Sequence, residues 1–144
     1  MNKIAIGSDH AGYELKNTIR DHLEGAGLQV MDFGTQTSSS VDYPTYAHAV
    51  ASEVASGVCE QGVLICGSGN GVNITANKHH GVRSALAWEP EVAKLAKEHN
   101  NANVLCLPAR FISPEKAMEI VDAFLRATFE GGRHQRRVEL IEPQ

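Results

Sequence analysis

The chain has 144 residues, of which 42% are hydrophobic and 21% charged, so it is long enough for one folded domain and too apolar to be disordered. Its net charge of −4 argues against a nucleic-acid-binding surface, and no apolar run approaches the roughly 18 residues of a membrane span. The first residues lack the apolar core of a signal peptide, and the three cysteines form no CxxC pair and no even disulfide set. These features favour a reduced, cytoplasmic setting.

Five short apolar runs alternate with five segments of helical spacing along the chain. In the first helical segment, Leu15, Ile19 and Leu23 recur at every fourth residue. Pro44 and Pro114 stand in the first turns of two later segments, where a helix tolerates proline. The predicted strands cover residues 3–8, 28–34, 63–66, 82–87 and 103–107, and the predicted helices cover residues 13–26, 43–57, 71–78, 89–99 and 114–128.

This alternation predicts a single α/β domain over residues 1–144, because short apolar strands joined by helices form parallel sheets that are covered on both faces. We expect a three-layer, doubly wound (Rossmann-like) sheet of five parallel strands with helices on both faces. A basic arm at about residues 131–144 closes the chain.

The stretch 63–78 carries the strongest chemical signal. An apolar strand ends at Cys66, and three glycines then alternate with small polar residues before a helix begins. Such a turn binds anions or developing negative charge, because the first N–H groups of a helix have no partner within it. The GxGxG spacing in mid-chain fits neither the dinucleotide fingerprint nor a GxxxxGK[ST] phosphate loop. Cys66 is a candidate base or nucleophile beside an oxyanion site, although a buried thiol without a role is the alternative.

A second polar group follows the first predicted strand. Asp9 and His10 form an acid–imidazole pair that would move protons or bind sugar hydroxyls. An aspartate that caps a helix beside an uninvolved histidine is the alternative. Because ligands of open parallel sheets bind at the carboxyl ends of the strands, Asp9, His10 and Cys66 would share one crevice if the first and third strands are neighbours.

The other candidates are weaker on their own. His99 stands at a helix C-terminus, where an imidazolium is favoured and capping is the common role. Arg110 and the arginines of the basic arm would bind a phosphate dianion or form a solvated basic surface. Cys106 is expected in the core because it lies inside an apolar strand, and His48 and His79 lack the spacing of metal ligands.

Several motifs in order resemble one known family. They are residues 6–12 (IGSDHAG), 42–44 (DYP), 65–71 (ICGSGNG), 76–78 (ANK), 98–105 (EHNNANVL) and 130–138 (EGGRHQRRV). Over nearly its whole length the chain resembles the type B ribose-5-phosphate isomerases, in the family that includes the galactose-6-phosphate isomerase subunits. The resemblance implies an enzyme without metal or cofactor that interconverts ribose 5-phosphate and ribulose 5-phosphate through an enediolate.

The resemblance also implies residue roles. Cys66 would be the base that moves a proton between C2 and C1, His99 would act as the acid in ring opening, and Ser68 would complete the catalytic group. Members without this cysteine carry a glutamate at the position of Val72, so Val72 fits the cysteine type. Asp9, His10 and Tyr43 would contact the sugar; Gly67, Ser68, Gly69, Asn70, Gly71 and Asn100 would hold the enediolate oxygens; Arg110, Arg133, His134 and Arg137 would hold the phosphate.

His99 and Cys66 are expected at opposite edges of the sheet, because His99 precedes the fifth strand whereas Cys66 ends the third. Such edges lie one strand length apart, on the order of 17–20 Å. We therefore expect a homodimer whose active site is shared between subunits, with the basic arm crossing as well. Whether such dimers pair into tetramers stays open.

Two other interpretations stay open. The first is the same reaction on another sugar phosphate, either a six-carbon one such as allose or galactose 6-phosphate, or a branched one. The second is a module that binds sugar phosphates without turning them over. Cys66 disfavours this module, because binding alone needs no thiol. Neither a nucleic acid nor a membrane is an expected partner.

Overall fold

The sheet has the strand order β2-β1-β3-β5-β4, and all of its strand pairs are parallel. The structure, a computed structural model, describes residues 3–143, so both ends of the domain predicted for residues 1–144 lie outside the described residues. The strands are β1 (Lys3–Ser8), β2 (Gln29–Asp32), β3 (Gln61–Cys66), β4 (Ser84–Leu86) and β5 (Val104–Pro108). The helices are α1 (Tyr13–Gly25), α2 (Tyr43–Ala55), α3 (Asn70–Ala76), α4 (Pro90–Asn100), α5 (Pro114–Arg126) and α6 (Arg133–Glu139), with a 3-10 turn η1 (His10–Gly12).

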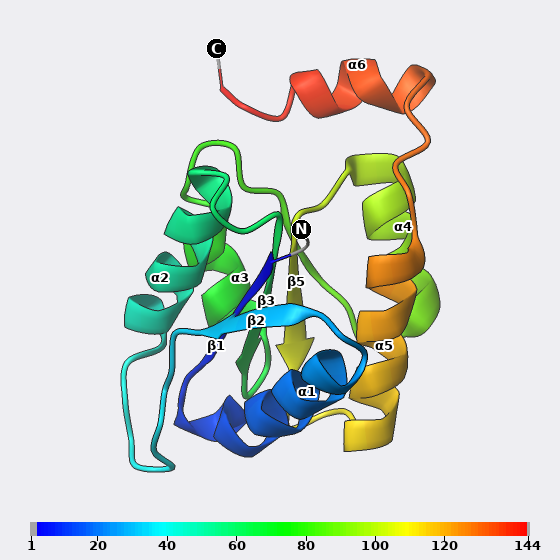
Figure 1. The fold of residues 1–144 in the computed structure, drawn as a ribbon. Helices are drawn as coiled ribbons and strands as arrows, with labels where there is room; N and C mark the ends of the chain where they lie inside the picture. The colour runs from blue at the N-terminus through cyan, green and yellow to red at the C-terminus, as the bar shows by residue number, and fades with distance from the viewer. Residues whose placement is uncertain (1–2, 144) are drawn as a thin grey trace.

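Helices cover both faces of the sheet, which confirms the predicted three-layer arrangement (Figure 1). Alternate side chains of each strand enter two separate cores, as the pleat of a strand requires. Ile4 and Ile6 of β1 pack in the core under α1, α4 and α5. Ala5 of β1 and Cys66 of β3 belong to the core under α2 and α3. Cys66 therefore faces the α2 and α3 layer.

The basic arm contains a helix that was not among the predicted elements. α6 begins after Gly132 and lies at the end of the molecule from which the β5 arrow points away (Figure 1). The side chain of Gln135 donates a hydrogen bond of 2.9 Å to Glu139 one turn later. Residue patterns do not predict this helix, because most of its side chains are polar and exposed and no apolar stripe marks it.

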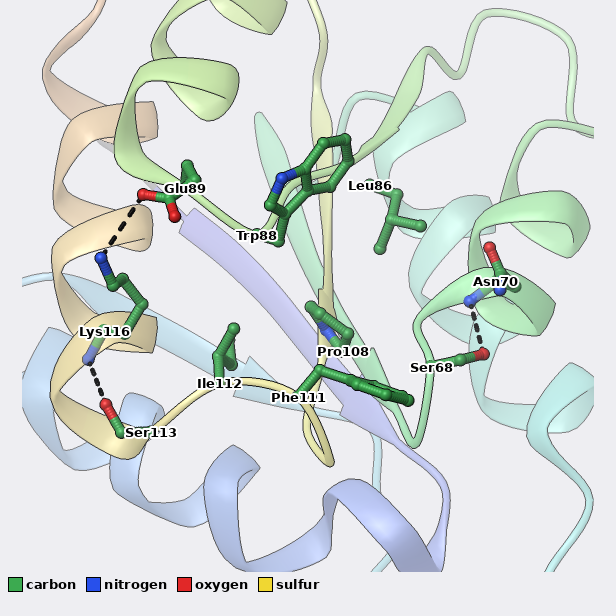
Figure 2. A pocket seen from close by; sticks show the side chains of 10 residues that line it. All are labelled: Ser68, Asn70, Leu86, Trp88, Glu89, Pro108, Phe111, Ile112, Ser113 and Lys116. Atoms are coloured by element: carbon green, nitrogen blue, oxygen red, sulfur yellow. Dashed lines mark hydrogen bonds and ion pairs between the residues drawn. The ribbon is translucent and has the colours of Figure 1, made fainter.

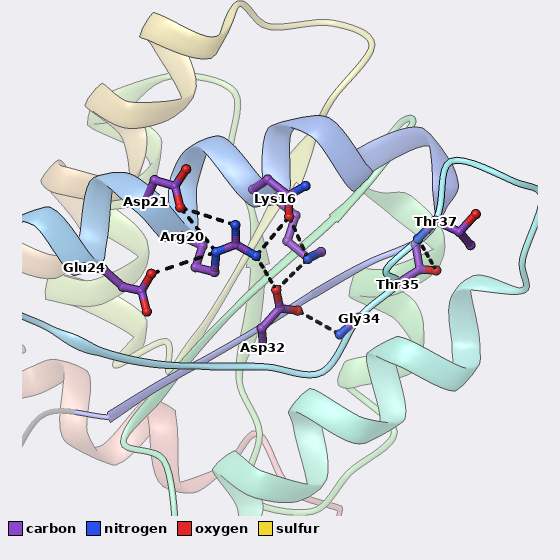
Figure 3. A network of polar contacts seen from close by, with 9 residues as sticks. Lys16, Arg20, Asp21, Glu24, Asp32, Gly34, Thr35 and Thr37 are labelled. Atoms are coloured by element: carbon purple, nitrogen blue, oxygen red, sulfur yellow. Dashed lines mark hydrogen bonds and ion pairs between the residues drawn. The ribbon is translucent and has the colours of Figure 1, made fainter.

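Polar contacts tie α1 to β2 near the carboxyl end of β1 (Figure 3). Nζ of the buried Lys16 lies 2.7 Å from a carboxylate oxygen of Asp32, and Arg20 contacts the same oxygen at 3.0 Å. The other oxygen of Asp32 accepts a 2.8 Å hydrogen bond from the Gly34 N–H, and the Gly34 carbonyl accepts one of 2.8 Å from Ser8. Burial alone would raise the pKa of Asp32, but the bonds from Lys16 and Gly34 outweigh it and hold that pKa below its ordinary value.

Among the described residues, none of the helices combines the length and apolar character needed to cross a membrane.

Candidate active site

The carboxyl ends of β1 and β3 meet at one place, because the two strands are neighbours. The backbone N–H of Asp9 donates a 3.3 Å hydrogen bond to the carbonyl of Ile65. A cavity of about 510 Å³ opens there, which we call the carboxyl-edge cavity. Its lining consists of Asp9, His10, Ala11, Tyr43, Cys66, Gly67, Ser68, Gly71, Arg110 and Phe111. The crevice expected from the sequence is therefore present.

Cys66 is the thiol that reaches this cavity. Its exposed fraction is 5%, whereas that of Cys59 and Cys106 is 0%. None of the three forms a disulfide within the described chain. Burial raises the pKa of Cys106 to about 12, as expected for a thiol in the core, and burial also raises the pKa of Cys59. Geometry thus separates Cys66 from the two structural cysteines.

The glycine loop is shaped by close neighbours. Gly69 has a φ of 78°, and an added Cβ there would lie 2.4 Å from Cδ1 of Leu86. A Cβ on Gly71 would lie 2.5 Å from the Tyr43 ring. Only glycine fits both positions, so the loop presents backbone rather than side chains to the cavity. α3 begins at Asn70, and Gly71 in its first turn, where the N–H groups lack partners within the helix, lines the same cavity as Cys66.

Asp9 and His10 are both held by the backbone. Oδ1 of Asp9 accepts a 3.2 Å hydrogen bond from the N–H of Gly12, so Asp9 caps the turn η1 and also lines the cavity. The capping interpretation of Asp9 is therefore confirmed, and its contact with a sugar stays a prediction. Nδ1 of His10 accepts a 3.1 Å hydrogen bond from the N–H of Val41. A neutral His10 then carries its proton on Nε2, where it can donate to a ligand.

Arg110 closes the cavity from the end of β5. Its backbone N–H donates a 3.0 Å hydrogen bond to the carbonyl of Gly67. A Cβ on Gly67 would lie 3.0 Å from the guanidinium of Arg110, so this group packs directly over the loop. The arrangement provides a fixed positive charge at the rim of the cavity, suited to a bidentate contact with phosphate.

The remaining predicted residues lie at the other end of the molecule. His99 lies in the last turn of α4, and α6 starts with Arg133 and His134, at the amino edge of the sheet (Figure 1). The rings of His99 and His134 are stacked with centroids 4.3 Å apart. Within one chain, the structure does not bring these groups to Cys66. Asn100 and Arg137 belong to the same end, as the last residue of α4 and as part of α6.

Glu130 lies close to both imidazoles. Its Oε1 is 3.8 Å from Nε2 of His99 and 3.4 Å from Nε2 of His134. Burial, followed by the neighbouring His99 and Arg133, lowers the pKa of His134 although Glu130 acts in the opposite direction. We call His99, Glu130 and His134 the amino-edge cluster.

A second hollow of about 560 Å³ adjoins the first and shares Ser68 and Phe111 with it. Figure 2 shows that Trp88 and Phe111 contribute aromatic walls, with Lys116 farther away, where its Nζ lies 3.4 Å from Glu89. Its lining consists of Ser68, Asn70, Leu86, Trp88, Glu89, Pro108, Phe111, Ile112, Ser113 and Lys116. Because neither Cys66 nor Asp9 lines it, the carboxyl-edge cavity is the better candidate for chemistry.

Three residues near the candidate groups were not singled out from the sequence. Ala11 and Phe111 line the carboxyl-edge cavity, and Glu130 joins the amino-edge cluster. The position of Phe111 just after a strand end was a usable signal, because ligands collect there. Glu130 had no such signal, since its role depends on contacts between α4 and the segment that precedes α6.

Comparison with known proteins shows the family to which the chain belongs. The model of the Ribose/Galactose Isomerase family matches residues 4–141. The chain is 50% identical over 141 residues to ribose-5-phosphate isomerase B of Escherichia coli, covering 98% of this chain and 95% of that protein.

Two solved structures have the same fold. Ribose-5-phosphate isomerase B of Clostridium thermocellum superposes with a TM-score of 0.96 at 48% identity, covering 96% of this chain and 94% of that one. The enzyme of Mycoplasma genitalium, solved with bound ribulose 5-phosphate, gives a TM-score of 0.94 at 46% identity, covering 96% and 93% of the two chains. Since the family model spans nearly the whole sequence and the relatives match over nearly their whole length, the chain belongs to the ribose/galactose isomerase family.

Proposed function

We propose that this chain is a sugar-phosphate isomerase that interconverts ribose 5-phosphate and ribulose 5-phosphate through an enediolate. The observation that carries this proposal is the position of Cys66, whose thiol lines a cavity between an acid–imidazole pair and a loop of backbone N–H groups. Membership of the family and the similarity to ribose-5-phosphate isomerase B support the choice of substrate. The absence of disulfides in the described chain agrees with action in the cytoplasm.

The reaction moves one proton between neighbouring carbons. With the sugar in its open aldehyde form, the Cys66 thiolate takes the proton from C2, and the electron pair forms the enediolate. The same thiol then returns a proton to C1, while a proton passes from O2 to O1, which leaves a hydroxyl at C1 and a carbonyl at C2. Backbone N–H groups of the loop 67–71 stabilise the negative charge on the two oxygens, because fixed donors need no reorganisation. Asp9, His10 and Tyr43 contact the sugar hydroxyls.

Two groups outside this cavity complete the proposed site. His99 acts as the acid in ring opening, and Arg133, His134 and Arg137 hold the phosphate together with Arg110. His99 and the three α6 residues lie at the amino edge, so they reach Cys66 only from a second copy of the chain. We therefore propose a homodimer in which each active site combines the carboxyl-edge cavity of one subunit with the amino edge of its partner.

Turnover in deuterated water tests the reaction. Incubation with ribose 5-phosphate is expected to give ribulose 5-phosphate that carries deuterium at C1, because the proton on the thiol exchanges with solvent. Cys66→Ser is expected to lose this incorporation while it still binds the sugar phosphate. Binding without exchange in the unmodified protein would instead favour the non-catalytic module. A panel of five- and six-carbon aldose phosphates, assayed alongside, identifies the preferred substrate.

Mixed dimers test the shared site. Cys66→Ala and His99→Asn subunits, each inactive alone, are unfolded together and refolded. Half of the random dimers then hold one intact site of two, so about a quarter of the wild-type activity is expected. A mixture that stays as inactive as its parents would refute the shared site, whereas the deuterium experiment would still stand.

A further inference from the structure

We propose that the amino-edge cluster of His99, Glu130 and His134 binds a zinc ion, and that this ion inhibits the enzyme. One ligand atom from each of these residues lies within 4.8 Å of the others. Oε1 of Glu130 is 3.4 Å from Nε2 of His134 and 3.8 Å from Nε2 of His99. Two imidazole nitrogens with one carboxylate oxygen form a donor set that zinc accepts, and water completes the coordination.

His134 supplies an independent observation. Its side chain is only 8% exposed, and it lies against Glu130. Within the described part of the chain, its buried Nε2 makes no hydrogen bond. Buried polar atoms almost always have a hydrogen-bond partner, so a ring nitrogen whose nearest polar neighbour is the Glu130 carboxylate at 3.4 Å points to a missing ligand. A metal ion at this place gives the nitrogen a partner.

The fold holds the three residues together through backbone contacts. The N–H of Glu130 donates a 3.0 Å hydrogen bond to the carbonyl of Glu98, so the segment before α6 runs beside the end of α4. The N–H of His134 donates a 3.0 Å bond to Gly131. The cluster is therefore a meeting point of two separate chain segments and is not the result of spacing along one helix.

Small movements convert the cluster into a coordination shell. Zinc bonds of about 2.0–2.2 Å in tetrahedral geometry place ligand atoms roughly 3.3–3.5 Å apart. The pair of Glu130 and His134 already has that separation at 3.4 Å. The ring planes of His99 and His134 are stacked, with 12° between them. Because a ring nitrogen's lone pair lies in the plane of its ring, one ring must turn about its Cβ–Cγ bond before both lone pairs point at the same ion.

The inhibitory part of this inference rests on the proposed function. There, His99 serves as the ring-opening acid and His134 holds phosphate. An imidazole bound to zinc can do neither, because the metal occupies its lone pair. Zinc is therefore expected to raise the KM for ribose 5-phosphate, and excess substrate is expected to reverse the inhibition.

Calorimetric titration of zinc chloride into the full chain tests the binding without substrate. One ion per chain is expected for the wild type, with Kd weakened by at least about tenfold in Glu130→Gln and in His99→Asn. Glu139→Gln is the matched control, because it removes the same charge from α6, where Glu139 bonds to Gln135. Equal affinity in Glu130→Gln and Glu139→Gln would refute the site, provided that both variants unfold at the wild-type temperature.

Two further variants exclude other sites. His48 and His79, whose ring nitrogens lie 2.7 Å apart, form a second imidazole pair, so His48→Asn must keep full affinity. Cys66→Ser must keep it as well, and cobalt bound in place of zinc must show no thiolate charge-transfer band. Loss of zinc binding in His48→Asn or in Cys66→Ser would show that the ion binds at another site, and would overturn the proposal. Stoichiometric zinc binding by a chain that fails to turn over ribose 5-phosphate would keep the metal site and refute the proposed function instead.

Discussion

The ring of Tyr43 occupies the space that a side chain at Gly71 would need. A Cβ added to Gly71 would lie 2.5 Å from Cε1 of Tyr43. Gly71→Ala is therefore expected to push the ring out of its position in the carboxyl-edge cavity and to lower kcat/KM by at least about tenfold, because small displacements of positioning groups are costly. Gly25→Ala is the control, since among the described residues its added Cβ meets no atom within 4 Å beyond its chain neighbours and the backbone of its own helix. Steady-state kinetics measures kcat/KM for both variants, and their unfolding temperatures must match the wild type. An equal kcat/KM for the two variants would contradict the role of Gly71.

Asp32 is expected to be the most sensitive acid in the contacts between α1 and β2. Asp32→Asn leaves the fully buried Lys16 without its carboxylate partner, which lies at 2.7 Å. Breaking a buried ion pair typically costs about 3–5 kcal/mol of unfolding free energy, and we expect the lower end because the Asp32 side chain keeps 14% exposure. Asp21→Asn, at a position with 71% exposure that contacts Arg20, should cost less than about 0.5 kcal/mol. Urea unfolding measures both, and similar losses would contradict the assignment.

Lys97 gives the stability a distinct pH dependence. Its amino group bonds to Gln61 and to the carbonyl of Phe124, and burial lowers its pKa to about 8. In the unfolded chain this pKa returns to about 10.4. Between these values the unfolded state binds a proton that the folded state lacks, so stability rises with pH in this window. Below it Lys97 is charged in both states, and the cost of burying the charge is full and constant.

Lys97→Met removes this dependence. The unfolding free energy of the wild type minus that of Lys97→Met is expected to increase from pH 7.5 toward pH 10 (about the window between the two pKa values). Lys94 on the same helix is exposed, so the difference in unfolding free energy between the wild type and Lys94→Met should not change with pH. A flat difference for both variants would show that the Lys97 pKa is not lowered by folding.

Alkylation should distinguish the cysteines in the native protein. Iodoacetamide is expected to label Cys66 and to inactivate the enzyme, because this thiol lines the cavity. Cys59 and Cys106 should stay unlabelled, since both are buried and burial raises the pKa of each. Ribose 5-phosphate should slow the labelling. Peptide mapping by mass spectrometry locates the label, and inactivation with the label on Cys106 would contradict the role of Cys66.

Local patterns were enough to predict the sheet and its crevice. Apolar runs marked each strand, and the rule that ligands bind at carboxyl ends linked Asp9 to Cys66 before their contact through Ile65 was known. Boundaries were less accurate. β4 covers only Ser84–Leu86 rather than residues 82–87, because strand pairing with β5, not hydropathy, sets its length.

The features that escaped prediction depend on contacts distant in sequence. α6 lacks an apolar stripe, and Glu130 acquires its neighbours only when the segment before α6 docks beside α4. The clash that makes Gly71 obligatory arises from Tyr43, which lies in another helix, α2. No periodicity within a single element encodes such pairs, and several of the implied roles stay predictions until variants are measured.

The length of the stretch from His99 to Arg110 sets the distance between two active centres. α4 ends at Asn100, β5 runs from Val104 to Pro108, and Arg110 follows two residues later over the glycine loop. In the proposed dimer, this one stretch supplies an acid to one centre and a guanidinium to the other. Its length therefore fixes the spacing of both centres at once, so that an insertion in β5 would disable the two together.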